Sequence, residues 1–395
     1  MNSINLKIAI AIIACISIFI SNTYSQESLK DLSDEKESKP FQFTFVYPLG
    51  TNGTNSPKIA NDISLNIFGG FNGGVNAMEL GAFVNVNHGD VNGFQGAGFT
   101  NVNIGKTTGV QCAGFYNQSY EFNGGQFAGF ANLNIKNSSG FMGAGFTNVV
   151  RGNMLGWQAA GFSNTTTGSI TGAQMAGFAN FSKDQVKGAQ LAGFANITEN
   201  IEGVQVAGFV NVANKVKGVQ LGFLNIADSV DGVPIGFLSI VRHGYHRFEL
   251  GASESLFANA SIKLGVEHFY NIFTFGFKQV DEDSYWSYGY GVGTLFALSP
   301  KVNMNIDAIS QQVNENEWNT TKLNLLNTVK LNISYKFTER IEILAGPSFN
   351  VMVSEFDFRD GIGSKSTFVP WSFYDKTHDD YTVKMFVGFN AGLRF

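Results

Sequence analysis

The sequence predicts an all-β protein made of two parts, an antiparallel β-barrel near the C-terminus and an array of short tandem repeats before it. Two patterns carry this prediction. Apolar and polar residues alternate through about the last 150 residues, and a Gly-Phe or Ala-Phe pair returns at a nearly constant spacing through the middle of the chain. Successive side chains of a strand point to opposite faces, so alternation indicates strands. A fixed short period indicates stacked repeats.

The barrel prediction begins with the final stretch of the chain. Counting back from Phe395 in twos gives an unbroken apolar set that ends at Tyr381, whereas the other set contains Arg394, Asn390 and Lys384. The same alternation fills further segments of roughly 10–16 residues, which is enough to cross a bilayer at a tilt. We therefore expect an antiparallel transmembrane β-barrel of about 8–10 strands, with strands at 247–253, 256–266, 269–279, 284–298, 301–313, 321–337, 340–355 and 380–395.

The links between these strands favour a barrel that lies in a membrane. The turns at 299–300 and 338–340 are tight, whereas the connections at 280–284, 314–320 and 356–380 are longer. Short and long links alternate in membrane barrels, because turns on one side are short and loops on the other side are long. The terminal aromatic residue of an alternating last strand also resembles the sorting signal of bacterial outer-membrane β-barrels.

The repeats keep three residue types in step. A phenylalanine recurs every 14 to 16 residues from Phe83 to Phe237, an asparagine follows nearly every ring by two positions, and a glutamine precedes most rings by four. Residues that keep the same place in every copy are expected to stack as structural ladders. The expected ladder residues are Phe99, Phe115, Phe130, Phe146, Phe162, Phe178, Phe194 and Phe209, with Asn101, Asn117, Asn132, Asn148, Asn164, Asn180, Asn196 and Asn211.

Two folds fit this array. In a β-solenoid each repeat forms one coil, coils stack about 4.8 Å apart, phenylalanines fill the core, and Asn and Gln amides satisfy one another. Alternatively, the repeats are strands of one larger barrel, whose outward face in one copy would be the mostly small or polar set from Trp157 to Thr165. Amphipathic helices do not fit, because glycine recurs every few residues. We favour the solenoid and keep the larger barrel as the alternative.

These patterns divide the chain into successive segments. A lysine followed by a short apolar run indicates a secretory signal peptide, and the charged stretch after it indicates a flexible linker. Two strands, expected as a hairpin, then precede the repeats. The expected segments are a signal peptide at 1–25, a linker at 26–40, N-terminal strands at 41–75, tandem repeats at 76–241 and barrel strands at 242–395.

Strand parity predicts which end of the barrel carries the repeats. If Phe395 ends on the periplasmic side, eight strands counted backwards bring the chain to His246 on that same side. The array is then expected below the barrel or inside it as a plug. A count that differs by one strand would put it outside the cell, so the sequence leaves the side open.

The repeats resemble a known family. The segment FVYPLGTNG (45–53) and tandem copies such as GVQVAGFVNVA (203–213) resemble the surface-repeat family of bacterial outer-membrane proteins, over most of residues 41–240. The resemblance implies export across the inner membrane of a Gram-negative bacterium and a location at the outer membrane or cell surface. It implies no mechanism, because the function of that family is largely undefined.

Composition and motifs exclude several functions. Charged residues make up 14% of the chain, and the formal net charge of −5 comes without any basic run, so nucleic acid is not an expected partner. The sequence has no phosphate-binding loop, no nucleophile elbow and no set of ligands spaced for a metal. We therefore expect no enzyme, and no catalytic, cofactor-binding or metal-binding residues.

One loop is the candidate for partner binding. The connection at 356–380 concentrates aromatic side chains, which often mark binding surfaces. The candidate residues are Phe368, Trp371, Phe373 and Tyr374, with packing onto the barrel mouth as the alternative. The expected function is a non-enzymatic outer-membrane or surface protein with a structural or partner-binding role, and the alternative is a passive channel. Expected partners are outer-membrane lipid and a surface ligand or another envelope protein; the sequence leaves the oligomeric state open.

Overall fold

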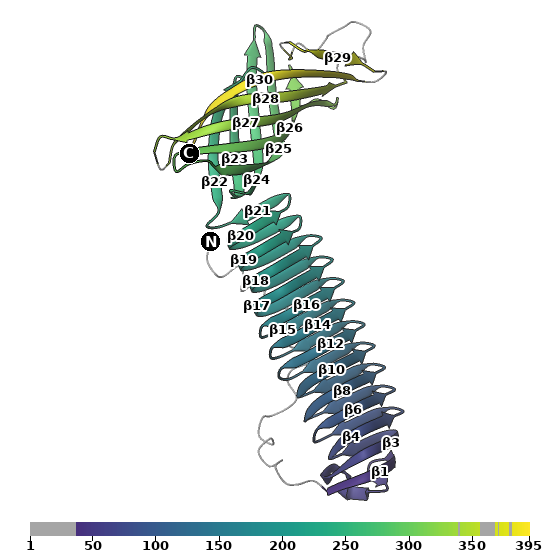
Figure 1. The fold of residues 1–395 in the computed structure, drawn as a ribbon. Helices are drawn as coiled ribbons and strands as arrows, with labels where there is room; N and C mark the ends of the chain where they lie inside the picture. Colours follow the sequence, from purple (N-terminus) through teal and green to yellow (C-terminus); the bar gives the residue numbers. More distant parts are fainter. Residues whose placement is uncertain (1–36, 339, 356–367, 370, 379–380) are drawn as a thin grey trace.

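The computed structural model describes residues 37–338, 340–355, 368–369, 371–378 and 381–395. The expected signal peptide and the linker up to residue 36 lie outside this part of the chain. Strands make up 76% of the structure and helix 2%, in a parallel β-solenoid of about 11 turns followed by a closed antiparallel barrel of eight strands. Figure 1 shows the solenoid as a long rod that meets one end of the barrel. The predicted fold class is confirmed, and the repeats are solenoid coils rather than strands of a larger barrel.

Each solenoid coil contains a longer strand, a tight corner and a short strand. The later coils run without a break through the opposite, polar turn, so that β17 to β20 each join a short strand to the next long one. The elements of the rod are β1 (Glu37–Val46), β2 (Leu49–Gly50), the 3₁₀ helix η2 (Gly53–Lys58), β3 (Ile59–Asn72), β4 (Gly74–Gly81), β5 (Val84–Asn87), β6 (Val91–Ala97), β7 (Thr100–Asn103), β8 (Lys106–Ala113), β9 (Tyr116–Ser119), β10 (Glu121–Ala128), β11 (Ala131–Asn134), β12 (Ser138–Ala144), β13 (Thr147–Val150), β14 (Met154–Ala160), β15 (Ser163–Thr166), β16 (Ile170–Ala176), β17 (Ala179–Ala192), β18 (Ala195–Ala207), β19 (Val210–Leu221), β20 (Leu224–Ile235) and β21 (Leu238–Val241).

The first coil corrects one expectation. β1 pairs in parallel with β3, with Phe41 opposite Ile63 and Phe43 opposite Leu65. Residues 41–75 therefore begin the solenoid and do not form a hairpin before it. A parallel partner is what the polar core requires, because Gln42 lies fully buried at the end of the stack and its Oε1 accepts a hydrogen bond from Asn52 at 2.7 Å. β1, β2 and η2 thus close the free end of the rod.

The solenoid core combines two amide ladders with a cluster of buried apolar side chains that includes Met154, Ile170 and Val186. Asn148 Nδ2 donates to Asn164 Oδ1 at 2.9 Å and to the carbonyl of Ala159 at 2.8 Å. In the parallel glutamine ladder, Gln174 Nε2 donates to Gln158 Oε1 at 2.8 Å. The asparagines donate toward the C-terminal coil and the glutamines toward the N-terminal coil, and these side chains are fully buried. Most coils therefore satisfy their neighbours' amides, as a buried polar ladder requires. Met142 interrupts the glutamine ladder, and Gln158 Nε2 there lies 4.0 Å from its sulfur.

Glycine occupies positions where coils approach too closely for a side chain. Gly188 has φ of +130°, and a Cβ added there would lie 1.9 Å from the carbonyl oxygen of Gly172 in the preceding coil. Equivalent glycines recur through the array with positive φ. Only glycine combines that backbone conformation with so close an approach.

The barrel follows the predicted pattern closely. Its wall is continuous, because β22 pairs with β30 as well as with β23. A further short strand, β29 (Tyr374–Thr377), pairs with β30 at the end that carries the long loops. The wall strands are β22 (Tyr245–Ser253), β23 (Ala258–Val266), β24 (Phe269–Val280), β25 (Asp283–Ala297), β26 (Val302–Glu315), β27 (Asn324–Lys336), β28 (Glu342–Ser354) and β30 (Thr382–Arg394).

The rod joins the barrel at the end that carries the short turns. The chain passes from β21 into β22 over three residues, and β21 packs against β23. Asn271 of β24 anchors the last coil, since its Nδ2 donates to the Gly236 carbonyl at 2.7 Å and its Oδ1 accepts from the Ser239 amide at 2.8 Å. The array therefore lies at the end of the barrel where the strand count expected it, and the rod extends from the barrel rather than filling it as a plug (Figure 1).

Candidate functional site

The phenylalanine ladder lies on the outside of the rod. Rings of successive coils stack in parallel, for example Phe146 on Phe162 and Phe162 on Phe178, each with centroids 4.9 Å apart and planes 2° apart. Phe178 and Phe194 are nevertheless 41% exposed. The expectation that these rings fill the core is wrong. Each ring from Phe99 onward follows a corner glycine. The core is filled instead by the amide ladders and by buried apolar side chains such as Ile170 and Val186.

A wide apolar face adjoins this ladder. The outward side chains of the long strands form two columns that run from β1 to β20 in unbroken register. One column is Phe41, Ile63, Met78, Phe94, Val110, Gly125, Phe141, Trp157, Ala173, Ala189, Val204, Val219 and Val233; the other is Phe43, Leu65, Leu80, Gly96, Cys112, Phe127, Gly143, Ala159, Met175, Leu191, Val206, Leu221 and Ile235. We call these two columns and the phenylalanine ladder the apolar face.

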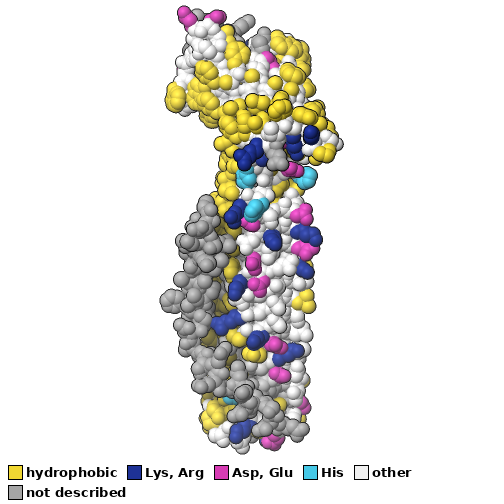
Figure 2. Space-filling view, turned by 90° about the vertical axis from the view of Figure 1, so that its left-hand side faces the viewer, with side chains coloured by type: hydrophobic (Ala, Val, Ile, Leu, Met, Phe, Trp, Pro, Cys, Tyr) yellow, Lys and Arg dark blue, Asp and Glu magenta, His cyan; other side chains and the backbone are white. Residues whose placement is uncertain are grey.

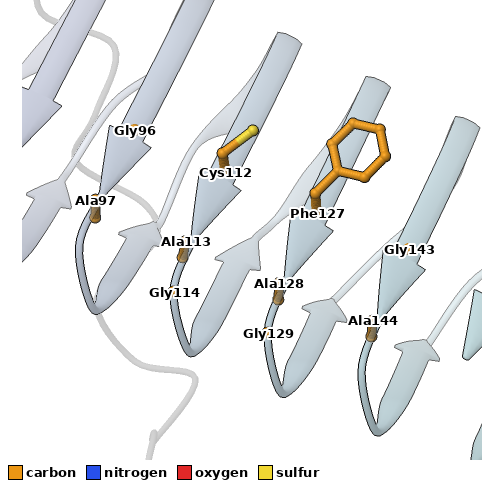
Figure 3. Close-up of a pocket in the computed structure, with 10 residues that line it drawn as sticks. All are labelled: Gly96, Ala97, Cys112, Ala113, Gly114, Phe127, Ala128, Gly129, Gly143 and Ala144. Atoms are coloured by element: carbon orange, nitrogen blue, oxygen red, sulfur yellow. The ribbon is translucent and has the colours of Figure 1, made fainter. Parts of the chain in front are cut away.

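The apolar face is hollowed along its middle. A shallow groove of about 460 Å³ runs from Gly96 to Ala144, and a second of about 700 Å³ continues from Gly143 to Val206. Figure 3 shows Cys112 and Phe127 on successive coils of the first groove, with smaller residues around them. The residues that line both grooves are apolar, and burial raises the pKa of the Cys112 thiol. The two grooves therefore offer apolar surface and no charged side chain.

The polar groups of the rod lie elsewhere. The column next to the apolar face on the same strands is mainly polar and includes Thr108, Lys187 and Lys217. Lys217 Nζ lies 3.0 Å from Glu202 Oε1 on the neighbouring coil, in an exposed ion pair. Figure 2 shows charged side chains on one side of the rod and a hydrophobic strip along its edge. The rod is therefore amphipathic across its width over its whole length.

The apolar face is continuous with the outer wall of the barrel. Phe237, the last ring of the ladder, stacks on Tyr290 of β25 at 4.9 Å and meets Phe273 of β24 edge-on at 6.0 Å. Phe275 and Phe277 extend the same outward column of β24 and are 49% and 44% exposed. Hydrophobic side chains also cover much of the barrel surface that is visible in Figure 2.

The barrel interior is filled by paired charges. Lys263 Nζ lies 2.7 Å from Asp307 Oδ2 and 2.8 Å from Glu249 Oε2. Arg394 Nη2 lies 3.0 Å from Glu249 Oε2, and its Nη1 lies 3.1 Å from Glu342 Oε2. All five side chains are buried. A hollow beside them measures about 10 Å³, which is the space of no more than one water molecule.

The long-loop end of the barrel is closed by an aromatic side chain. Phe368 is fully buried in a cluster with Tyr285, Leu326 and Phe386, and its carbonyl accepts a hydrogen bond from Lys278 Nζ at 2.9 Å. Of the four aromatic residues expected to bind a partner, Phe368 therefore does not face solvent. Burial of the Phe368 ring removes apolar surface from water, which stabilises its packing inside the barrel mouth.

The other three candidate residues are exposed. Trp371, Phe373 and Tyr374 are 50%, 59% and 39% exposed, and Phe373 lies 6.4 Å from the outward ring of Phe349. The structure thus splits the group: one ring enters the barrel, and three lie at its outer rim. Aromatic side chains at this level are typical of the girdles of membrane barrels.

One carboxyl group lies deep in the rod. Glu79 is fully buried in the glutamine column, where Asn66 and Asn72 donate to Oε1 at 2.9 and 2.6 Å, and Asn87 and Gln95 donate to Oε2 at 2.7 Å. Burial raises the pKa of Glu79 to about 7, although the four amide donors oppose the shift. Sequence analysis missed this residue, because it occupies a glutamine position of a degenerate first repeat.

The described residues contain no group of three or more His, Cys, Asp or Glu side chains that could hold a metal ion. None of the helices in the described segments has the length and apolar character needed to cross a membrane. Comparison with protein-family models and with curated proteins found no match to this chain.

Proposed function

We propose that this chain is a non-enzymatic outer-membrane protein, in which a filled barrel anchors a rod that binds a partner through its apolar face. The observation that carries the proposal is the contrast between the two surfaces of the barrel. Its outer wall is apolar, with Phe275, Ile333 and Val387 among the exposed residues, whereas its interior holds the ion pairs around Lys263 and Arg394. A wall of this kind suits contact with lipid, and an interior crossed by these ion pairs favours an anchor over a channel.

The location proposal rests on sequence and topology together. The N-terminal pattern of a signal peptide and the resemblance to the surface-repeat family favour export to the outer membrane. Short turns of outer-membrane barrels face the periplasm. We therefore place the rod, which leaves the barrel at its short-turn end, on the periplasmic side.

Electrophoresis tests the anchor. A folded membrane barrel keeps its compact form in cold dodecyl sulfate, so the unheated full chain should migrate differently from the boiled chain. Equal mobility before and after boiling would contradict the anchor proposal. In planar bilayers the protein should be electrically silent, and reproducible conductance steps would favour the passive channel instead.

Protease treatment of cells tests the orientation. The rod should resist added protease in intact cells and become cleavable once the outer membrane is permeabilised. Cleavage within 76–241 in intact cells would place the rod outside the cell. A soluble periplasmic marker that survives in the intact sample controls for leakage.

A further inference from the structure

We infer that the apolar face of the rod is covered by the hydrocarbon chains of membrane lipids. This inference rests on the proposed function, since it assumes that the barrel lies in a bilayer. It adds the chemical class of the partner, which is a fatty-acyl chain.

The apolar face is larger than the apolar patches that soluble monomers expose to water. Its two columns span thirteen paired strands, roughly 60 Å at about 4.8 Å per strand, and include exposed Phe41, Phe94, Phe141, Trp157 and Leu191. A monomeric soluble protein seldom exposes a continuous apolar patch of more than a few hundred Å². The chain of one lipid leaflet spans only about 15 Å, so the face has room for several chains in succession.

The chemistry of the face favours hydrocarbon over a protein partner. Apart from the thiol of Cys112 and the indole N–H of Trp157, no side chain of the two columns donates or accepts a hydrogen bond. Protein interfaces carry about one hydrogen bond per 100–200 Å² and a polar rim. The backbone offers few free groups here, because each strand is paired with a neighbour on both sides. A partner that forms no hydrogen bonds fits such a surface.

The apolar face continues into the outer wall of the barrel, which gives lipid chains a path onto the rod. Phe237 stacks on Tyr290 and contacts Phe273, and the outward column of β24 then continues through Phe275 and Phe277. Lipid chains that contact this column can therefore extend onto the ladder without crossing a polar strip. The two outward columns of the long strands contain no charged side chain, so none interrupts the apolar face itself.

Nitroxide labels test the inference on the full chain reconstituted into vesicles of phosphatidylethanolamine and phosphatidylglycerol. Cys112, which lies on the apolar face, carries the label in a Cys15→Ser background. The matched control is Thr108→Cys in the same background with Cys112→Ser, because Thr108 lies on the same strand in the polar column. A third label at Phe275→Cys, also with Cys112→Ser, reports the barrel wall. Electron paramagnetic resonance then compares collisions with oxygen, which concentrates in hydrocarbon, and with a water-soluble nickel chelate.

Lipid on the face predicts that the oxygen-to-nickel collision ratio at Cys112 is severalfold higher than at Thr108→Cys and close to that at Phe275→Cys. A nickel-accessible label at Cys112 beside an oxygen-accessible one at Phe275→Cys would overturn the inference and leave the anchor proposal intact. A Cys112 label that neither reagent reaches would also overturn it, in favour of a second copy or another protein on the face. A nickel-accessible label at Phe275→Cys would instead reject the anchor proposal itself.

Discussion

Replacing Glu79 by glutamine should remove a pH dependence that the wild-type rod carries in its core. The carboxyl group is fully buried, and its pKa is raised from 4.5 to about 7 by burial. Below pH 4.5 the group is protonated in both the folded and the unfolded chain, so it does not oppose folding. Between pH 4.5 and 7 the unfolded chain loses its proton first, and the stability of the rod falls as the pH rises.

The size of this effect follows from the shift. A difference of one pKa unit corresponds to about 1.4 kcal/mol, so the rise from 4.5 to about 7 lowers the free energy of unfolding by about 3 kcal/mol above pH 7. Glutamine has no charge to desolvate, and its amide continues the ladder that Gln95 begins. Whichever oxygen the new NH2 group replaces, it faces two amide donors, so two neighbouring amides must turn to accept from it. The variant should therefore recover up to about 3 kcal/mol at pH 8.

Unfolding of the rod can be followed by the fluorescence of Trp157, which is the tryptophan that lies in the rod. Trp286, Trp318 and Trp371 are replaced by phenylalanine, and urea unfolding of the full chain in detergent is followed by fluorescence at pH 4.5 and pH 8. The parent should lose stability between these pH values, and the Glu79→Gln variant should lose much less. Equal losses in the two proteins would refute the reasoning.

A surface carboxylate serves as the control for this assay. Glu202 is exposed, and its hydrogen bond with Lys217 lowers its pKa. Its folded pKa lies below the unfolded value, so any stability it adds is present above that value and is lost as the pH falls. Glu202→Gln should therefore leave the loss between pH 4.5 and 7 in place.

Three further substitutions probe the ladders and the barrel. Asn164→Ala removes an amide that accepts a hydrogen bond from Asn148 and donates one to the Met175 carbonyl. This variant should lower the urea midpoint by the equivalent of about 2–3 kcal/mol. Its control, Thr171→Ala at an outward position, should have little effect. Arg394→Met leaves buried Glu249 and Glu342 without their arginine and should destabilise the barrel by about 3–5 kcal/mol, seen as a lower temperature of the heat-dependent mobility shift. Phe368→Ala empties the barrel mouth and should lower that temperature by the equivalent of about 3 kcal/mol, whereas the exposed Trp371→Ala should not. Unchanged values for Asn164→Ala, Arg394→Met or Phe368→Ala would contradict the packing described above.

The sequence was sufficient to predict most of the fold because both parts of the chain repeat a local rule. Alternation placed the strands of the barrel within a few residues; the strand expected at 301–313 is β26 at Val302–Glu315. The constant spacing of the phenylalanine motif distinguished stacked coils from barrel strands. Counting strands back from Phe395 then placed the rod at the correct end of the barrel.

The inside and outside of the rod could not be predicted in the same way. Phe194 and Asn196 keep equal places in the repeat, and hydrophobicity suggested that the ring is buried. The structure shows the opposite. The ring follows Gly193, where an added Cβ would lie 2.1 Å from the Gly177 carbonyl oxygen, so the backbones of successive coils pack closely at this corner. The ring projects outward and the amide inward.

The apolar face was also beyond sequence reasoning, although its residues were in view. Its columns mix Phe94, Gly96, Ala159 and Leu191, and no single repeat looks amphipathic. The face emerges only when the register aligns thirteen strands. Likewise, Phe368 could not be separated from Trp371 by composition, because both belong to one aromatic stretch and only packing distinguishes them.

The two amide ladders have a consequence for how long the rod can be. Asparagine N–H groups point toward the barrel and glutamine N–H groups point away from it, as at Asn148 and Gln174. The dipoles of the two columns therefore oppose each other, unlike the peptide dipoles of an α-helix, which add along its axis. A coil that carries both amides adds one side-chain dipole of each sense, and the two oppose each other. The amide ladders therefore build up no axial dipole as coils are added, and in this respect they set no limit on the number of coils.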